Sequence, residues 1–87
     1  MATPGSAMVE VRVELKAGVE DPEGESVAKS LGLLGIDAIS SVRTAKVYRI
    51  AFTGVSEAEA AERAQRAVDR LLANPVVHRV SVTSVPG

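Results

Sequence analysis

The sequence predicts an α+β domain, a two-layer sandwich in which two helices cover one face of an antiparallel sheet. Apolar and charged residues alternate near the start of the chain, and apolar and polar residues alternate near its end, as is typical of strands with one buried face. Between these segments, apolar residues recur at helical spacing in two stretches that begin with N-capping signals. The chain has 87 residues, which suits one small domain.

The first predicted strand covers residues 8–16. Successive side chains of a strand point to opposite faces, so one face of this segment is apolar and the other is charged. The apolar face consists of Val9, Val11, Val13 and Leu15. We expect residues 1–7 to form a disordered tail and residues 8–87 to form the single domain.

The first predicted helix begins at Asp21 and Pro22, the order of an N-cap residue followed by the first helical residue. Glu23 and Glu25 place negative charge in the first turn, where the helix dipole favours it. Gly35 is a typical helix end. The apolar face between them consists of Val27, Leu31 and Leu34.

Residues 36–53 are rich in β-branched side chains, and two arrangements fit them. One face of the second half is formed by Tyr48, Ile50 and Phe52. No Gly, Pro, Asn or Asp lies between Asp37 and Gly54, so a tight hairpin turn is poorly supported. The stretch is either one long bent strand or two strands joined by an atypical turn at residues 43–46.

The second predicted helix covers residues 54–73 and begins with a capping box of Ser56 and Glu59. Its apolar stripe consists of Ala61, Ala64, Val68 and Leu71, widened by Ala60, Ala67 and Leu72. Asn74 and Pro75 end the helix, and a strand follows at residues 76–85. The order β-α-β(β)-α-β is that of a ferredoxin-like sandwich.

Composition and motifs argue against an independent enzyme. The absence of Cys excludes disulfides, thiolate nucleophiles and Cys-ligated zinc. The single histidine, His78, has no partner ligands in sequence, and the glycines do not form a phosphate loop. A net charge of −1, with one Tyr and one Phe, disfavours nucleic acid and anionic membranes as partners. We predict a binding or assembly module that pairs with a second copy of itself.

Basic residues gather in two places. On the second helix they alternate with acidic residues, which favours a solvated face; they are Arg63, Arg66 and Arg70. A denser group lies before and within the predicted strand at residues 43–49, at Arg43, Lys46 and Arg49. Two interpretations of this group stay open: charge on the solvent side, or contact with an acidic partner or a phosphate.

Three segments together resemble the PurS family, the small subunits of phosphoribosylformylglycinamidine synthase. They are VELKAGVEDPEGESV at 13–27, SLGLLGIDAISSVRTAKVYRIAF at 30–52 and LLANPVVHRVSV at 71–82. The first follows the family pattern Leu-Lys-Pro-Gly-Val-x-Asp-Pro-x-Gly with Ala17 in place of Pro. The second contains Val-Arg-x-Gly-Lys with Ala45 in place of Gly. The third matches the family's Leu-Leu-Ala-Asn-Pro-Val unchanged.

The resemblance implies a PurS-like fold and a place in the fourth step of de novo purine synthesis. In the split enzyme, a large synthetase subunit binds ATP and the ribonucleotide, and a glutaminase subunit releases ammonia. The small subunit has no known catalytic group, associates with itself as a dimer or tetramer, and bridges the other two. The complex uses ATP, magnesium and glutamine, and we expect this subunit to bind none of them.

We expect partner contacts at the bend and at the two turns that flank the helices, namely Asp21, Pro22, Arg43, Lys46, Asn74 and Pro75. The rival interpretation is a ferredoxin-like regulatory module that binds a small molecule between subunits, near Ala17 and Gly18. No segment approaches the ~18 apolar residues of a membrane span, and no secretion signal is present. We therefore expect a cytoplasmic protein with no membrane or nucleic-acid partner.

Overall fold

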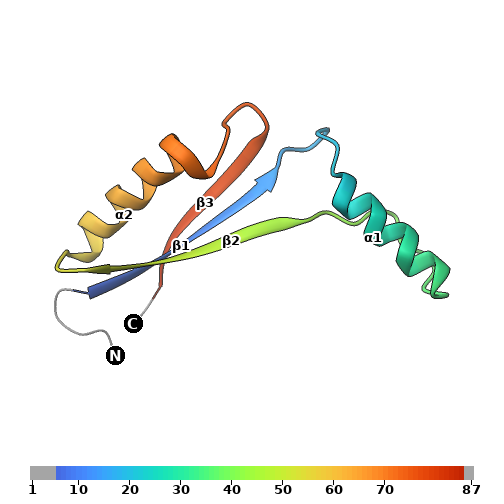
Figure 1. Cartoon of the computed structure of the whole chain (residues 1–87), viewed down its shortest axis with the longest axis horizontal. Coiled ribbons are helices and arrows are strands. Elements are labelled where there is room, and N and C mark those ends of the chain that lie inside the picture. Colours follow the sequence, from blue (N-terminus) through green and yellow to red (C-terminus); the bar gives the residue numbers. More distant parts are fainter. Residues whose placement is uncertain (1–5, 86–87) are drawn as a thin grey trace.

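The structure, a computed structural model, describes residues 6–85 and contains a three-stranded antiparallel sheet with two α-helices (Figure 1). The sheet order is β2-β1-β3, so the first strand lies in the centre. The elements are β1 (Ser6–Leu15), α1 (Pro22–Leu33), β2 (Ala45–Thr53), α2 (Glu57–Ala67), the π-helical turn η1 (Val68–Leu72) and β3 (His78–Val85). The predicted α+β class and antiparallel sheet are confirmed.

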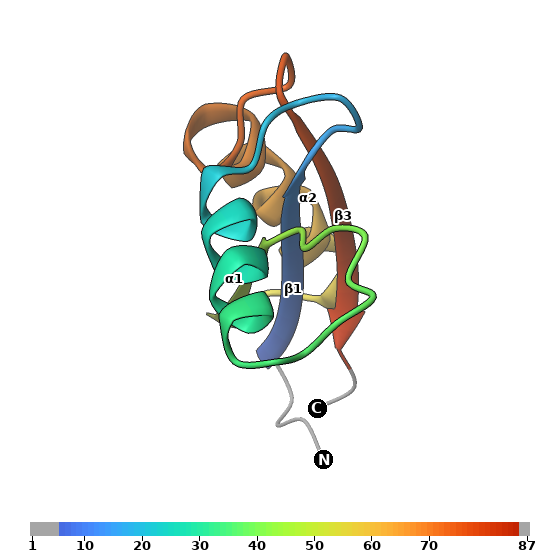
Figure 2. The same ribbon diagram turned by 90° about the vertical axis from the view of Figure 1, so that its right-hand side faces the viewer.

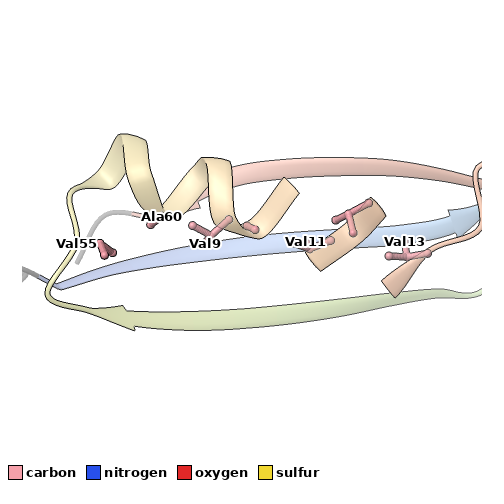
Figure 3. Packing of buried hydrophobic residues seen from close by; sticks show 7 residues of the cluster. Val9, Val11, Val13, Val55 and Ala60 are labelled. Atoms are coloured by element: carbon pink, nitrogen blue, oxygen red, sulfur yellow. The ribbon is translucent and has the colours of Figure 1, made fainter. Parts of the chain in front are cut away.

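The core lies between α2 and the inner face of β1 (Figure 3). Its buried residues are Val9, Val11, Val13, Val55, Ala60, Ala64 and Val68. Ala60 and Ala64 are fully buried, and their small side chains let the axis of α2 approach the sheet closely. The alternation predicted for the first strand and the capping box of α2 are therefore confirmed.

Several boundaries differ from the predictions. β3 begins at His78 and not at residue 76, because residues 75–77 form the turn before it. β1 begins at Ser6, so Ser6 and Ala7 pair with β2 instead of belonging to the predicted tail; residues 1–5 of that tail lie outside the described residues. β2 is one strand of residues 45–53, and residues 36–44 before it have no regular secondary structure. Neither a long bent strand nor a pair of strands forms there, because β1 is already paired along its length from residue 6 to residue 14.

The predicted stripe of the second helix is wrong at Leu71, whose side chain is 84% exposed. The helix widens into a π-turn at its end, where the Ala73 N–H donates to the Val68 carbonyl over 3.3 Å. A π-turn holds more residues than an α-turn and so rotates the following side chains. Leu72 takes the place beside the core that the α-helical periodicity gave to Leu71.

The position of α1 is the main departure from the expected arrangement of two helices on one face. Within the described chain, only α2 packs on the sheet, mainly against β1 and β3. α1 runs past the end of the sheet, and residues 36–44 return beside it (Figures 1 and 2). The radius of gyration is accordingly 16.8 Å, against about 12 Å for a compact domain of this length.

Candidate functional site

The predicted contact residues gather at one end of the sheet, where β1 ends and β2 and β3 begin. Asp21 and Pro22 start α1, and Arg43 and Lys46 lie on the segment that returns from α1 into β2. Asn74 and Pro75 form the turn before β3 (Figure 1). Five of the six are exposed, namely Pro22, Arg43, Lys46, Asn74 and Pro75. Asp21 is buried, and the Arg43 guanidinium is bonded within the chain.

Asp21 ties the start of α1 to the segment that enters β2. Its Oδ1 accepts the Gly24 N–H at 2.8 Å as an N-cap, and its Oδ2 accepts the Thr44 N–H at 2.7 Å. The Thr44 hydroxyl lies within hydrogen-bond distance of both carboxylate oxygens. The N–H groups of Thr44 and Gly24 stabilise the charged carboxylate and hold the pKa of Asp21 below its ordinary value of 3.8.

Gly24 lets these two segments touch. A β-carbon on Gly24 would collide with the carbonyl oxygen of Val42, which lies on the returning segment. The Asp-Pro-x-Gly pattern at residues 21–24 therefore has a structural reason: Asp21 supplies the cap and Gly24 supplies the space. From helix propensity alone, Gly24 is expected only to weaken the helix. The structure shows that it also lets two backbone segments approach closely.

Arg43 binds its own chain. Its guanidinium donates to the carbonyl of Val19 at 2.7 Å and to those of Lys16 and Leu15 at 3.1 and 3.4 Å. These three carbonyls lie at the end of β1 and in the loop that follows it. Arg43 thus fixes the returning segment to the sheet. We call the set Asp21, Gly24, Arg43 and Thr44 the lock.

The turn at Asn74 is also organised internally. The Asn74 side-chain oxygen accepts the Val76 N–H at 3.0 Å, and the Asn74 N–H donates to Nδ1 of His78 at 2.9 Å. A histidine nitrogen that accepts a backbone N–H is unprotonated at that position. His78 therefore has a structural contact at the start of β3. Pro75, by contrast, stays exposed at the tip of the turn.

Two hollows flank the lock. The first, of about 350 Å³, lies between the sheet end and α1, and among its lining residues are Glu23, Lys46, Tyr48, Leu72 and His78. The second, of about 540 Å³, lies between α1 and residues 40–43. Ala17 and Gly18, the loop named for a small-molecule module, line neither of these hollows.

The described residues hold no cluster of three or more His, Cys, Asp or Glu side chains that could bind a metal ion. No helix among them is long and apolar enough to cross a membrane. The side chains of Asp21 and Arg43 bind backbone groups at this end of the sheet and join the base of α1 to the segment that enters β2 and to the loop after β1.

Comparisons with known proteins give the family. The model of the family described as PurS, phosphoribosylformylglycinamidine (FGAM) synthase, matches residues 8–86. The PurS subunit of this synthase from Archaeoglobus fulgidus is 43% identical over 75 residues, covering 86% of this chain and 94% of that relative. The crystal structure of Methanocaldococcus jannaschii PurS has a TM-score of 0.78 at 30% identity, covering 91% and 95% of the two chains.

A chain in the structure of PurLQS from Thermotoga maritima shares the fold, with a TM-score of 0.80 at 24% identity, covering 92% of this chain and 98% of that chain. The family match spans almost the whole sequence and includes the Asp-Pro-x-Gly pattern on which the lock depends. The chain belongs to the PurS family of phosphoribosylformylglycinamidine synthase subunits.

Proposed function

We propose that the chain is the non-catalytic assembly subunit of phosphoribosylformylglycinamidine synthase. It binds the glutaminase and the ATP-dependent synthetase subunits and holds them in the relative position that ammonia transfer requires. Membership of the PurS family supports this role. So does the sheet end, where the polar side chains of the lock are used in internal hydrogen bonds. ATP, magnesium and glutamine then bind to the larger subunits.

The observation that carries the proposal is a sheet whose cover is incomplete. α2 packs on β1 and β3, whereas the inner face of β2 is left half-exposed at Tyr48, Ile50 and Phe52. α1 makes no substantial contact with the sheet of its own chain. One chain therefore has a strip of sheet, formed by Tyr48, Ile50 and Phe52, that packs against the core cluster but stays partly exposed, and it has a helix with no sheet beneath it.

A second copy of the chain supplies both missing surfaces. The apolar stripe of α1 includes Val27, which is 39% exposed, and Leu34, which is 77% exposed. If each α1 packs on the other copy's β2, both stripes are buried by one two-fold exchange. The charges of the two surfaces are also opposite. Lys46 borders the partly exposed strip on β2, and α1 carries Glu23 and Glu25 in its first turn.

The exposed turns are then left for the larger subunits. Pro22 and Pro75 protrude from neighbouring turns at one end of the sheet, and Asn74 shapes the second turn through its bond to the Val76 N–H. We assign Pro22, Asn74 and Pro75 to contact with the larger subunits. Lys46 belongs to the interface between copies, and Asp21 and Arg43 act through the lock.

Reconstitution tests the proposal. Formation of formylglycinamidine ribonucleotide is measured with the synthetase and glutaminase subunits, with and without this chain, using either glutamine or ammonium as the nitrogen source. Ammonium bypasses the glutaminase, so its rate should not depend on the chain. The glutamine-dependent rate should require it. Equal glutamine-dependent rates with and without the chain would overturn the proposal.

A further inference from the structure

α1 and the segment that returns from it form an arm, residues 22–42, that extends beyond the sheet (Figure 1). The buried apolar cluster lies under α2 and contains no residue of the arm. The arm is instead attached at its base by the hydrogen bonds of Asp21 and Arg43. Its direction therefore depends on a few polar contacts and not on the core.

We propose that the lock is a positioning device that fixes the direction of the arm, so that it can engage a second copy in a closed dimer. This inference rests on the proposed self-association through α1. Asp21 and Thr44 hold the two chain segments of the arm together at its base. Arg43 then fixes that base to the carbonyls at the end of β1.

Direction matters because the exchange is reciprocal. In a two-fold dimer, both arms must point correctly at once for both strips of sheet to be covered. An arm that samples other directions lowers the population of the binding-competent state and weakens the apparent affinity by the same factor. A free arm can also reach a third copy, which produces open chains instead of closed dimers.

The geometry of the lock suits this task. Arg43 binds three acceptors, the carbonyls of Leu15, Lys16 and Val19, so the returning segment cannot rotate about one bond. Gly24 packs directly against the Val42 carbonyl, which holds the two segments of the arm close together at its base. The lock therefore joins these two segments and ties them to the end of β1, while contributing nothing to the apolar cluster under α2.

Two variants test the proposal, Arg43→Gln and Thr44→Val, alone and together. Their matched controls are Arg49→Gln, which removes an exposed ion pair with Glu10, and Thr83→Val, at an exposed position of β3. The dimer dissociation constant of each full-length variant is measured by sedimentation, and its sheet content by circular dichroism.

We expect the double lock variant to raise the dissociation constant by roughly 10- to 100-fold, the upper figure applying if each arm is competent a tenth of the time. Larger oligomers should appear at high concentration, while the sheet signal and the controls stay unchanged. An unchanged constant would overturn the inference, and so would loss of the sheet, which would place the lock in folding. A monomeric unsubstituted chain would instead refute the self-association on which the inference rests.

Discussion

The backbone of Gly24 lies directly against the carbonyl oxygen of Val42, and this approach brings the base of α1 to the segment that enters β2. No side chain fits between the two, because a β-carbon at Gly24 would meet backbone atoms that cannot move aside. The contact closes the same junction that Asp21 and Thr44 close by hydrogen bonds. A single glycine thereby decides whether the lock can form.

Substitution of two glycines of α1 should have opposite effects. Replacing a helical glycine with alanine normally stabilises a helix by roughly 1 kcal/mol. Gly32→Ala should follow this rule, since nothing lies within 4 Å of the added carbon. Gly24→Ala should instead lower the melting temperature and weaken the dimer. Thermal denaturation of both variants checks this, and a stabilised Gly24→Ala would show that the close approach is absent.

Acid should weaken the lock. Because the pKa of Asp21 is lowered below 3.8 in the folded chain, the stability it contributes is complete above that pH and is lost as the pH falls through the lower folded value. Asp21→Asn retains a capping oxygen but lacks the charge. Urea denaturation should find it less stable than the unsubstituted chain at pH 7, with the difference shrinking as the pH falls below 3.8.

The control for this titration is Glu14. Its pKa is also lowered, chiefly by the hydrogen bonds from Arg79, but its carboxylate pairs with Arg79 and Arg12 and not with the residues of the lock. Since the lock directs the arm, acid should weaken the dimer as well as the fold, and Glu14→Gln should leave this weakening of the dimer in place. A dimer that weakens equally with pH in the Asp21→Asn variant would show that another group is responsible.

The close packing of α2 on the sheet should not tolerate larger side chains. Ala64 is fully buried against the core, whereas Ala58 is exposed on the same helix. Ala64→Leu should cost about 1–3 kcal/mol of unfolding free energy, because it overpacks the interface of helix and sheet. Ala58→Leu should change it by less than about 0.5 kcal/mol. Chemical denaturation of the two variants distinguishes them, and equal stabilities would contradict the packing.

The apolar stripe of α1 should matter for association and not for folding. Val27 lies on the stripe, and Ser26 beside it is exposed on another side of the helix. Val27→Glu should dissociate the dimer, because it places a charge in the apolar contact with the other copy's β2. Ser26→Glu should not. Light scattering at micromolar concentration reports both, and a dimeric Val27→Glu variant would remove α1 from the interface.

The sequence predicts those parts of the fold that depend on local signals. The alternation of Val9, Val11 and Val13 marks β1, and the bonds between Ser56 and Glu59 form the expected capping box. The N-cap at Asp21 likewise follows from its place before Pro22. Each of these signals lies within a few residues of the structure that it specifies.

The direction of α1 could not be predicted in this way. It is set by Thr44, which is 23 residues from Asp21, and by the bonds of Arg43 to carbonyls 24 to 28 residues away. From the sequence, Arg43 was expected either to lie on the solvent side or to contact an acidic partner or a phosphate. Its hydrogen bonds to backbone carbonyls of its own chain were not predicted. Backbone detail was missed as well: Ala38 has a left-handed φ of 63°, whereas Ala45, which replaces a usual glycine, begins an ordinary strand.

The central claim is that one chain alone leaves its sheet partly uncovered and that a second copy covers it. The molar mass of the purified protein, measured by light scattering at micromolar concentration, tests this claim most directly. We predict a mass of at least twice the 9.0 kDa of one chain. A mass of 9.0 kDa, with the chain still folded, would show that the exposed faces of α1 and β2 need no second copy.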